Sequence, residues 1–198
     1  MSLRYFLPIY LLIYVGVAFV WRSYIVRKHT GINPVTFKGN DNAHDFVGRI
    51  FKLVFVVVVL VVFVNSFFPD VYTYTAPVQW LEHRWSSSIG VGLLLFSLVW
   101  IALAQSQMGE AWRIGIDTEH RTPLVQNGLF GISRNPIFLG MMLTLFGLFL
   151  TLPNAFTLLA FVLGVVLIGV QVRLEEEYLA RVHEEAYEDY RRRVRRWL

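Results

Sequence analysis

Five long apolar runs restrict the possible folds of this chain more than any other feature of its sequence. They are Tyr5–Val20, Leu53–Val64, Ile89–Ala104, Ile137–Leu152 and Ala155–Val170. With flanking residues, each run approaches the roughly 20 residues that an α-helix needs to cross a bilayer. Backbone groups in lipid must pair internally, so such runs form helices or a closed barrel, whose strands would alternate apolar and polar residues. These runs do not alternate, so the sequence predicts an all-α, polytopic membrane protein with about five transmembrane helices.

The composition places the chain in the same class. Of its 198 residues, 56% are hydrophobic and only 16% are charged. A soluble domain of this size needs more charge on its solvated surface. We therefore interpret residues 1–198 as one integral membrane domain, with the first three spans in 1–107 and most of the polar chemistry in 108–198.

Basic residues are distributed unevenly between the loops. Three segments hold most of them: Arg22, Arg27, Lys28, Lys38, Arg49 and Lys52; Arg113, Arg121 and Arg134; and Arg173, Arg181, Arg191, Arg192, Arg193, Arg195 and Arg196. The remaining segments carry only Arg4 and Arg84. Because cytoplasmic loops carry the excess of Lys and Arg, we expect the N-terminus outside and the C-terminus in the cytoplasm. Attraction to anionic lipid headgroups explains this basic charge, and nothing in it requires nucleic acid.

Several classes of function are disfavoured by what the sequence lacks. The chain has no cysteine, which excludes disulfides, iron–sulfur clusters and thiolate zinc sites. Its histidines all lie outside the apolar runs, which argues against a haem held between spans; they are His29, His44, His83, His120 and His183. The cores of the runs contain no charged residue of the kind that marks ion pathways. We therefore expect no metal site and no transport path.

The first polar segment of interest runs from Gly109 to Gly140. Asn135 is placed to cap a helix that begins at Pro136, since proline at that position has no N–H to leave unpaired. Arg134 directly precedes this helix end, whose free N–H groups and dipole favour anions. The segment therefore suggests a carboxylate or phosphate site, with binding of Arg134 to lipid headgroups as the equal alternative.

The second polar segment runs from Gln171 to Leu198. An apolar residue recurs at every fourth position, which predicts a long cytoplasmic helix continuing the fifth span; the stripe comprises Leu174, Tyr178, Val182, Ala186, Tyr190 and Val194. Glu175 and Glu176 lie where this helix leaves the bilayer. Because adjacent helical residues point about 100° apart, we expect one carboxylate to face a ligand and the other to pair with an arginine. The terminal arginines with Trp197 and Leu198 are interpreted as an interfacial anchor.

A family resemblance is carried by these two segments together. The stretch LVQNGLFGISRNPIFLG, Leu124 to Gly140, resembles the first signature of the isoprenylcysteine carboxyl methyltransferase and phospholipid methyltransferase superfamily. The stretch RLEEEYL, followed by Tyr187, Tyr190 and Val194, resembles its second signature. The resemblance covers about the C-terminal half, so residues 108–198 would form the catalytic part.

The resemblance implies an S-adenosylmethionine-dependent methyltransferase that holds its donor between the cytoplasmic end of a helical hairpin and the C-terminal helix. It implies catalytic roles for Arg134 and Glu176. It also implies donor-binding roles for Gly128, Asn135, Pro136, Gly140, Glu175, Tyr187 and Tyr190. The chain departs from the family pattern at four positions: Asn135 replaces His, Phe130 and Phe138 replace Tyr, and Glu184 replaces Gly.

The expected acceptor is a hydrophobic or lipidic molecule in the bilayer. A carboxylate nucleophile is already ionised, whereas an amine must first lose a proton, and Asn135 cannot serve as the base. This favours carboxyl methylation, as in isoprenylcysteine carboxyl methyltransferases, with N-methylation of a phospholipid amine as the alternative in which a glutamate acts as base. Two other classes stay open: a non-enzymatic membrane scaffold, and a small redox or nitrogen-oxide-related membrane protein with this fold.

Overall fold

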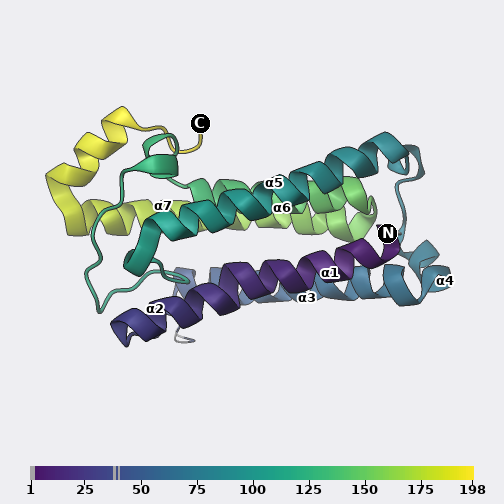
Figure 1. Ribbon diagram of the computed structural model, residues 1–198, viewed down its shortest axis with the longest axis horizontal. Coiled ribbons are helices and arrows are strands. Elements are labelled where there is room, and N and C mark those ends of the chain that lie inside the picture. The colour runs from purple at the N-terminus through teal and green to yellow at the C-terminus, as the bar shows by residue number, and fades with distance from the viewer. Residues whose placement is uncertain (1–2, 38, 40) are drawn as a thin grey trace.

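All the regular elements in the described part of the chain are helices (Figure 1). The computed structural model describes residues 3–37, 39 and 41–198, so the basic residue Lys38 lies outside the described residues. The α-helices are α1 (Leu3–Val15), α2 (Arg22–Thr30), α3 (Ala43–Phe67), α4 (Pro69–Tyr72), α5 (Arg84–Met108), α6 (Pro136–Thr151) and α7 (Ala155–Arg193). A π-helical turn joins α1 to α2 over Gly16–Trp21; short 3₁₀ turns are Thr73–Thr75, Gln79–Leu81, Gly109–Ala111 and Gly128–Gly131.

The membrane spans agree with the apolar runs of the sequence. Four helices of the described chain are long and apolar enough to cross a membrane: Arg4–Thr30, Ala43–Phe67, Arg84–Ala111 and Ala155–Arg193. The run Ile137–Leu152 forms the shorter apolar helix α6, whose 16 residues extend about 24 Å at 1.5 Å per residue. The prediction of an all-α membrane protein with about five membrane helices is therefore confirmed.

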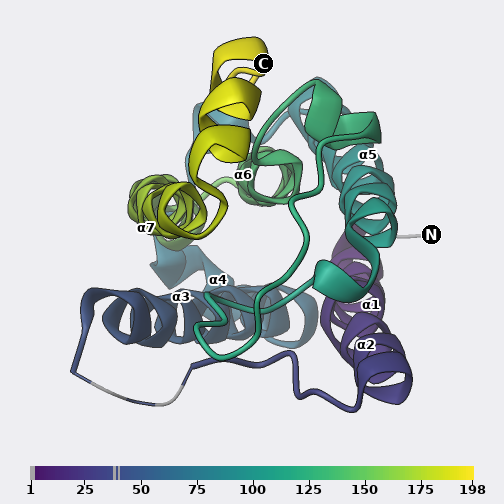
Figure 2. The same ribbon diagram turned by 90° about the vertical axis from the view of Figure 1, so that its left-hand side faces the viewer.

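The helices form two layers (Figure 2). One layer contains α5, α6 and α7, and the other contains α3 with the continuous helix α1–α2. Close contact between α5 and α6 depends on two small residues, since a Cβ on Gly90 would lie 2.7 Å from the carbonyl oxygen of Gly147. Small residues allow this kind of backbone approach between membrane helices. The two layers meet where α3 packs on α7 and where the π-helical turn Gly16–Trp21 packs on α5.

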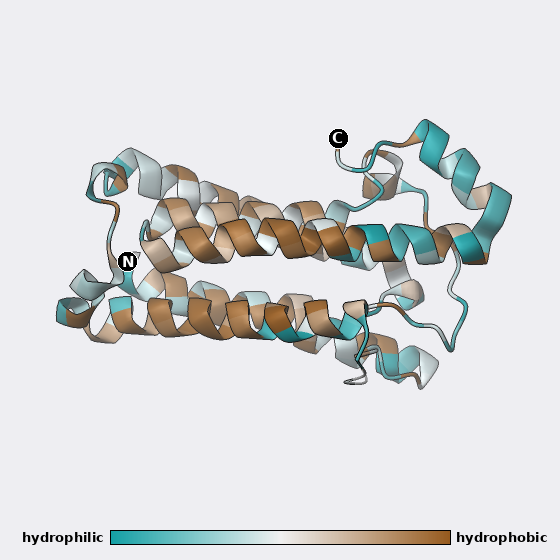
Figure 3. Cartoon of the chain, turned by 180° about the vertical axis from the view of Figure 1, so that it is seen from behind, coloured by the Kyte–Doolittle hydropathy of each residue, from teal (hydrophilic) through white to brown (hydrophobic). Residues whose placement is uncertain are grey.

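Hydropathy divides the molecule along its long axis (Figure 3). Apolar residues cover the outer faces of the long helices; on α3, for example, Leu53, Val56 and Leu60 are exposed. Such faces are stable against lipid chains and costly in water. Hydrophilic residues gather at the end of the bundle where α7 bends and the C-terminal segment folds back. The candidate site lies at this polar end.

The π-helical turn fixes the first span against α5. A π-turn breaks the regular α-helical hydrogen-bond pattern locally, and such turns are frequent at functional sites. Here the carbonyl of Ala18 accepts a buried hydrogen bond of 2.9 Å from Gln105 Nε2 of α5. Gln105 is 4% exposed, so this bond pairs two polar groups inside the bundle.

The C-terminal helix is bent, which corrects the prediction of one continuous stripe. Glu184 has φ 46° and ψ −121°, a conformation that is not helical. Beyond it, the chain turns back toward α6 (Figure 1). As a result, Tyr187, Tyr190 and Val194 form a small buried cluster of their own. Periodicity failed here because a single residue with positive φ changes the helix direction without changing the spacing of the apolar residues.

Substituting glycine at the bend is expected to stabilise the protein. A residue with a side chain at positive φ stores roughly 1–3 kcal/mol of strain, and glycine adopts such angles freely. Glu184→Gly should therefore raise the free energy of unfolding in detergent micelles by about 1 kcal/mol. The matched control, Glu185→Gly, removes the same charge from a regular helical position and should lower it by about 1 kcal/mol. Equal destabilisation by both substitutions would contradict the assigned strain.

Candidate functional site

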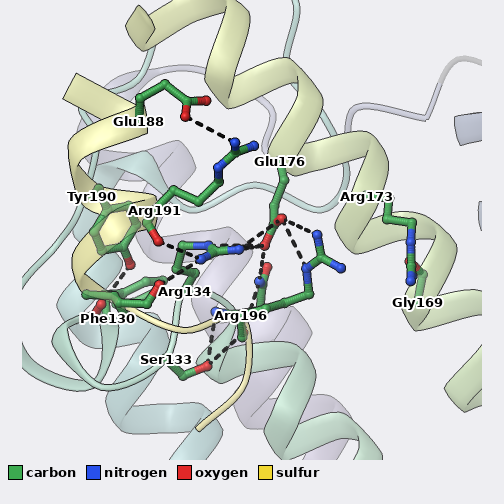
Figure 4. Close-up of polar contacts among 12 residues, drawn as sticks. Phe130, Ser133, Arg134, Gly169, Arg173, Glu176, Glu188, Tyr190, Arg191 and Arg196 are labelled. Atoms are coloured by element: carbon green, nitrogen blue, oxygen red, sulfur yellow. Dashed lines mark hydrogen bonds and ion pairs between the residues drawn. The ribbon is translucent and has the colours of Figure 1, made fainter. Parts of the chain in front are cut away.

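The two signature segments meet through a buried ion pair at the polar end of the bundle (Figure 4). Arg134, directly before α6, places Nη2 3.1 Å from Oε1 and 3.2 Å from Oε2 of Glu176 on α7. Asn135 donates from Nδ2 to the same carboxylate at 2.9 Å, across 41 residues of sequence. The side chains of Arg134 and Glu176 are 8% and 9% exposed. Both residues expected to be catalytic thus contact one another directly.

Arg196 completes this cluster and was missed by the sequence analysis. Its Nη2 lies 2.8 Å from Glu176 Oε2, and its Nε lies 3.1 Å from the same oxygen. A backbone hydrogen bond joins the same two segments, because the N–H of Arg134 donates to the carbonyl of Arg195 at 2.9 Å. The interpretation of the terminal arginines as an interfacial anchor is therefore wrong for Arg196. Nothing in the tail sequence distinguishes this arginine from its neighbours, because only the bend at Glu184 brings it back.

The adjacent glutamates have different surroundings, as their angular separation predicted. Glu176 accepts hydrogen bonds from Arg134, Asn135 and Arg196, so the protein itself occupies its carboxylate. Charge-assisted bonds of this kind are strong and favour the ionised acid. Glu175 instead accepts one bond, at 3.1 Å, from Gln171 Nε2 one turn earlier on α7. Glu176 organises the site, while Glu175 is the carboxylate that faces a cavity.

That cavity lies between the two helix layers and has a volume of about 690 Å³. Its polar end contains Arg134, Asn135, Gln171 and Glu175. Its remaining walls are mostly apolar side chains of α1, α3 and α6. Cavities that combine apolar walls with a few converging polar groups are typical small-molecule and lipid sites. The charged end can orient a polar group while the walls hold hydrocarbon.

Besides Asn135 and Glu175, two more of the expected donor-binding residues line the cavity, Pro136 and Tyr190. Pro136 begins α6, and its carbonyl accepts a hydrogen bond of 2.8 Å from Trp100 Nε1. Tyr190 donates from its hydroxyl to the carbonyl of Phe130 at 2.7 Å. Tyr187 is 1% exposed, and its hydroxyl has no hydrogen-bond partner in the part of the chain that the structure describes. Tyr187 lies in the cluster behind the cavity wall rather than in the wall.

The two glycines of the first signature lie outside the cavity lining. Gly128 has φ +64°, and a Cβ there would lie 2.5 Å from the side chain of Gln107. A Cβ on Gly140 would lie 2.5 Å from Cγ1 of Ile101 on α5. Both positions therefore require glycine for packing and turn geometry. Their expected contact with a donor stays a prediction.

The loop between α5 and α6 runs across one end of the bundle (Figure 2), and several of its residues line the cavity. Arg113 lines the cavity and donates from Nε to Asp117 Oδ2 at 2.9 Å. Burial by itself would raise the pKa of Asp117, but hydrogen bonds from Arg113 and the backbone amides of His120 and Glu119 hold it below its ordinary value. The loop is also attached to α7, because Tyr178 donates to the carbonyl of Asp117. Sequence reasoning missed this loop network.

Comparison with known families decides the class. Residues 85–186 match the sequence model of the family described as phospholipid methyltransferase. This segment is 102 of the 198 residues and contains the first signature and the RLEEEYL stretch of the second, whereas Tyr187, Tyr190 and Val194 lie beyond it. The chain belongs to the phospholipid methyltransferase family. The predicted superfamily is thus confirmed, and a search of curated proteins finds no match.

Membership in the phospholipid methyltransferase family gives the chain a coarse assignment as a membrane methyltransferase. The matched segment begins at α5 and ends just beyond the bend in α7, so it contains the hairpin and the ion pair of Arg134 with Glu176. The first two spans, which supply the other half of the cavity wall, lie outside it. Among the described residues, no group of three His, Asp or Glu side chains could hold a metal ion.

Proposed function

We propose that this chain is an S-adenosylmethionine-dependent methyltransferase that modifies a lipid-like acceptor at the membrane surface. One observation carries the proposal: one cavity joins a polar end, built from both family signatures, to apolar walls formed by the candidate membrane helices. An acceptor with a hydrocarbon chain and a small nucleophile fits this division. Lipid partitioning would also concentrate such an acceptor near the site.

The polar end suits the proposed donor. When bound, S-adenosylmethionine supplies an electrophilic methyl group on a sulfonium, and the carbon–sulfur bond breaks as a nucleophile's lone pair attacks the methyl carbon. The N–H groups at the N-terminus of α6 would bind a carboxylate. The positive charge of Arg134, whose own N–H groups bind Glu176 and the carbonyls of Arg191 and Val194, would favour a carboxylate there. Glu176 keeps Arg134 in place, since its carboxylate contacts that guanidinium through both oxygens. The residues mainly position the reactants and exclude water.

An amine is the nucleophile that this geometry favours. The sequence argument for a carboxylate rested on the absence of a base at Asn135, but Glu175 places a carboxylate at the cavity. Glu175 could take a proton from an ammonium before attack, and it would repel a second carboxylate. Lys52 and Arg113 also line the cavity, which makes carboxyl methylation the second candidate.

The proposed orientation follows the basic residues. The end of the bundle that carries Arg134 and Arg196 would face the cytoplasm, and the N-terminus of α1 would face outside. This arrangement places the α5–α6 loop and the C-terminal segment on the side that the positive-inside rule favours. A charged methyl donor would then reach the site from the cytoplasm without crossing the bilayer.

Sealed vesicles of both orientations can test activity and sidedness together. Membranes that contain the protein are supplied with radiolabelled S-adenosylmethionine, and the label in the lipid extract is measured. We expect more label in the lipid extract than in control membranes without the protein, and only when the donor is on the face that carries the C-terminus. A protease-cleavable tag after Leu198 locates the C-terminus in a separate experiment. Absence of labelling on either face would favour the scaffold alternative. Labelling from the opposite face would refute the assigned orientation.

A further inference from the structure

The cavity wall contains a buried polar atom for which the described residues supply no partner. Gln171 is 4% exposed and lines the cavity, yet its Oε1 has no hydrogen-bond partner among the described residues. A buried acceptor left unpaired is costly, so such an atom at a cavity wall indicates a ligand that donates a hydrogen bond. This oxygen therefore points to the chemistry of the missing group: it must carry N–H or O–H.

The neighbouring carboxylate makes the requirement more specific. The other atom of the same amide, Nε2, donates to Glu175 Oε1 at 3.1 Å. This contact holds the two side chains together, with the amide oxygen and the carboxylate both at the cavity. Two adjacent acceptors, one of them an acid, suit a positively charged nitrogen that has at least two N–H groups. Resting on the proposed function, we propose that Gln171 and Glu175 together bind the nitrogen of the methyl acceptor.

The pair also explains how the site would distinguish successive methylation states. Each transfer replaces one N–H of the acceptor by N–CH₃. A primary or monomethyl ammonium has enough N–H groups for both oxygens, a dimethyl ammonium has one, and a trimethyl ammonium has none. The affinity therefore decreases at the dimethyl stage, because one of the two oxygens is left unpaired. Gln171 supplies the acceptor for this second hydrogen bond.

The position of Gln171 favours the acceptor over the donor as its ligand. Gln171 lies one turn before Glu175 on α7, on the side of the long apolar part of that helix. Arg134 and Asn135, which suit the donor, instead bind Glu176, the residue that follows Glu175 on α7. A group that enters from the apolar walls meets Gln171 first.

Binding of four amphiphiles that differ only in nitrogen methylation tests the proposal without any turnover. The probes are dodecylamine, its N-methyl and N,N-dimethyl derivatives, and dodecyltrimethylammonium; the three amines are protonated at neutral pH, because their pKa lies near that of lysine. Dissociation constants are measured with protein in nanodiscs, with empty nanodiscs as background. For the unmodified protein we expect similar affinity for the first two probes and a loss of about tenfold at the dimethyl probe.

Substitution of Gln171 by methionine should shift the decrease in affinity from the dimethyl probe to the trimethyl probe. In Gln171→Met only Glu175 remains as acceptor, so the first three probes should bind alike and only the trimethyl probe should be weaker. Gln171→Glu keeps two acceptors and should retain the step at the dimethyl probe, which covers the case in which the methionine variant does not fold. Gln79→Met, an exposed residue on a distant turn, is the matched control and should match the unmodified protein.

Binding of S-adenosylhomocysteine to the same variants separates the two possible ligands. The proposal requires that Gln171→Met binds it as the unmodified protein does. If Gln171→Met lost affinity for S-adenosylhomocysteine while its affinities for the four amphiphiles were unchanged, the amide oxygen of Gln171 would bind the donor, and the proposal would be overturned. The proposal would also be overturned if the affinity of Gln171→Met still decreased at the dimethyl probe. If the proposed function were wrong, no lipid would be labelled in the vesicle experiment. The affinities for the four amphiphiles could still be measured and compared, so the two failures can be distinguished.

Discussion

Glu176→Gln is expected to destabilise the protein by about 3–5 kcal/mol, because it leaves the buried guanidinium of Arg134 without a counter-charge. The same carboxylate binds Arg196, so the substitution also releases the segment that folds back after the bend at Glu184. Donor affinity should fall at least tenfold, since Arg134 is then no longer held in position. The free energy of unfolding in detergent and the dissociation constant for S-adenosylhomocysteine measure the two effects.

Two further variants separate structural loss from loss of the site. Glu185→Gln removes the same charge from an exposed position of the same helix, so stability and donor affinity should stay within about 0.5 kcal/mol of the unmodified protein. The double variant Arg134→Met with Glu176→Leu removes both members of the pair; apolar replacements of this kind often restore stability. We expect it to regain stability without regaining donor binding. Recovery of both would show that the pair is purely structural.

Glu175→Gln is expected to lower kcat by about 10²–10⁴, the range typical for loss of a general base. The physical reason is that an ammonium acceptor has no free lone pair until it gives up a proton, and Glu175 is the carboxylate placed at the cavity to receive it. Gln keeps the size of the side chain and a hydrogen-bonding oxygen, so binding should change less than turnover. Initial rates with saturating donor and a long-chain amine acceptor measure the effect.

The same substitution decides between the two candidate acceptors. If the acceptor is a carboxylate, no proton has to be removed, and loss of the negative charge on Glu175 should leave kcat unchanged or raise it. Glu177→Gln, two residues further along α7 and exposed, should have no effect with either acceptor. A variant of Glu175 with full activity on an amine would exclude this residue as the base.

A cavity built from both halves of the chain has a consequence for how this family member selects its acceptor. The polar end comes from the matched segment 85–186, whereas much of the apolar wall comes from α1 and α3, outside that segment. Under the proposed function, the methyl transfer chemistry and much of the acceptor contact would thus be carried by different helices. Changes on the cavity faces of α1 or α3 should alter acceptor preference with little effect on donor binding.

The sequence by itself determined the fold class and the approximate limits of the membrane helices. These features depend on short-range physics: an apolar run must satisfy its own backbone in lipid, and Pro136 marks a helix start by its own geometry. Local angular spacing was also enough to predict that Glu175 and Glu176 would have different partners. Each of these inferences uses only residues that are close in the chain.

Only the tertiary structure decided what the site contains. The bend at Glu184 depends on a positive φ that apolar periodicity does not encode, and it returns Arg196 to Glu176. The unpaired oxygen of Gln171 becomes visible only when its burial and the cavity beside it are known. Contacts of this kind join residues far apart in the chain, and their geometry follows from how whole helices pack.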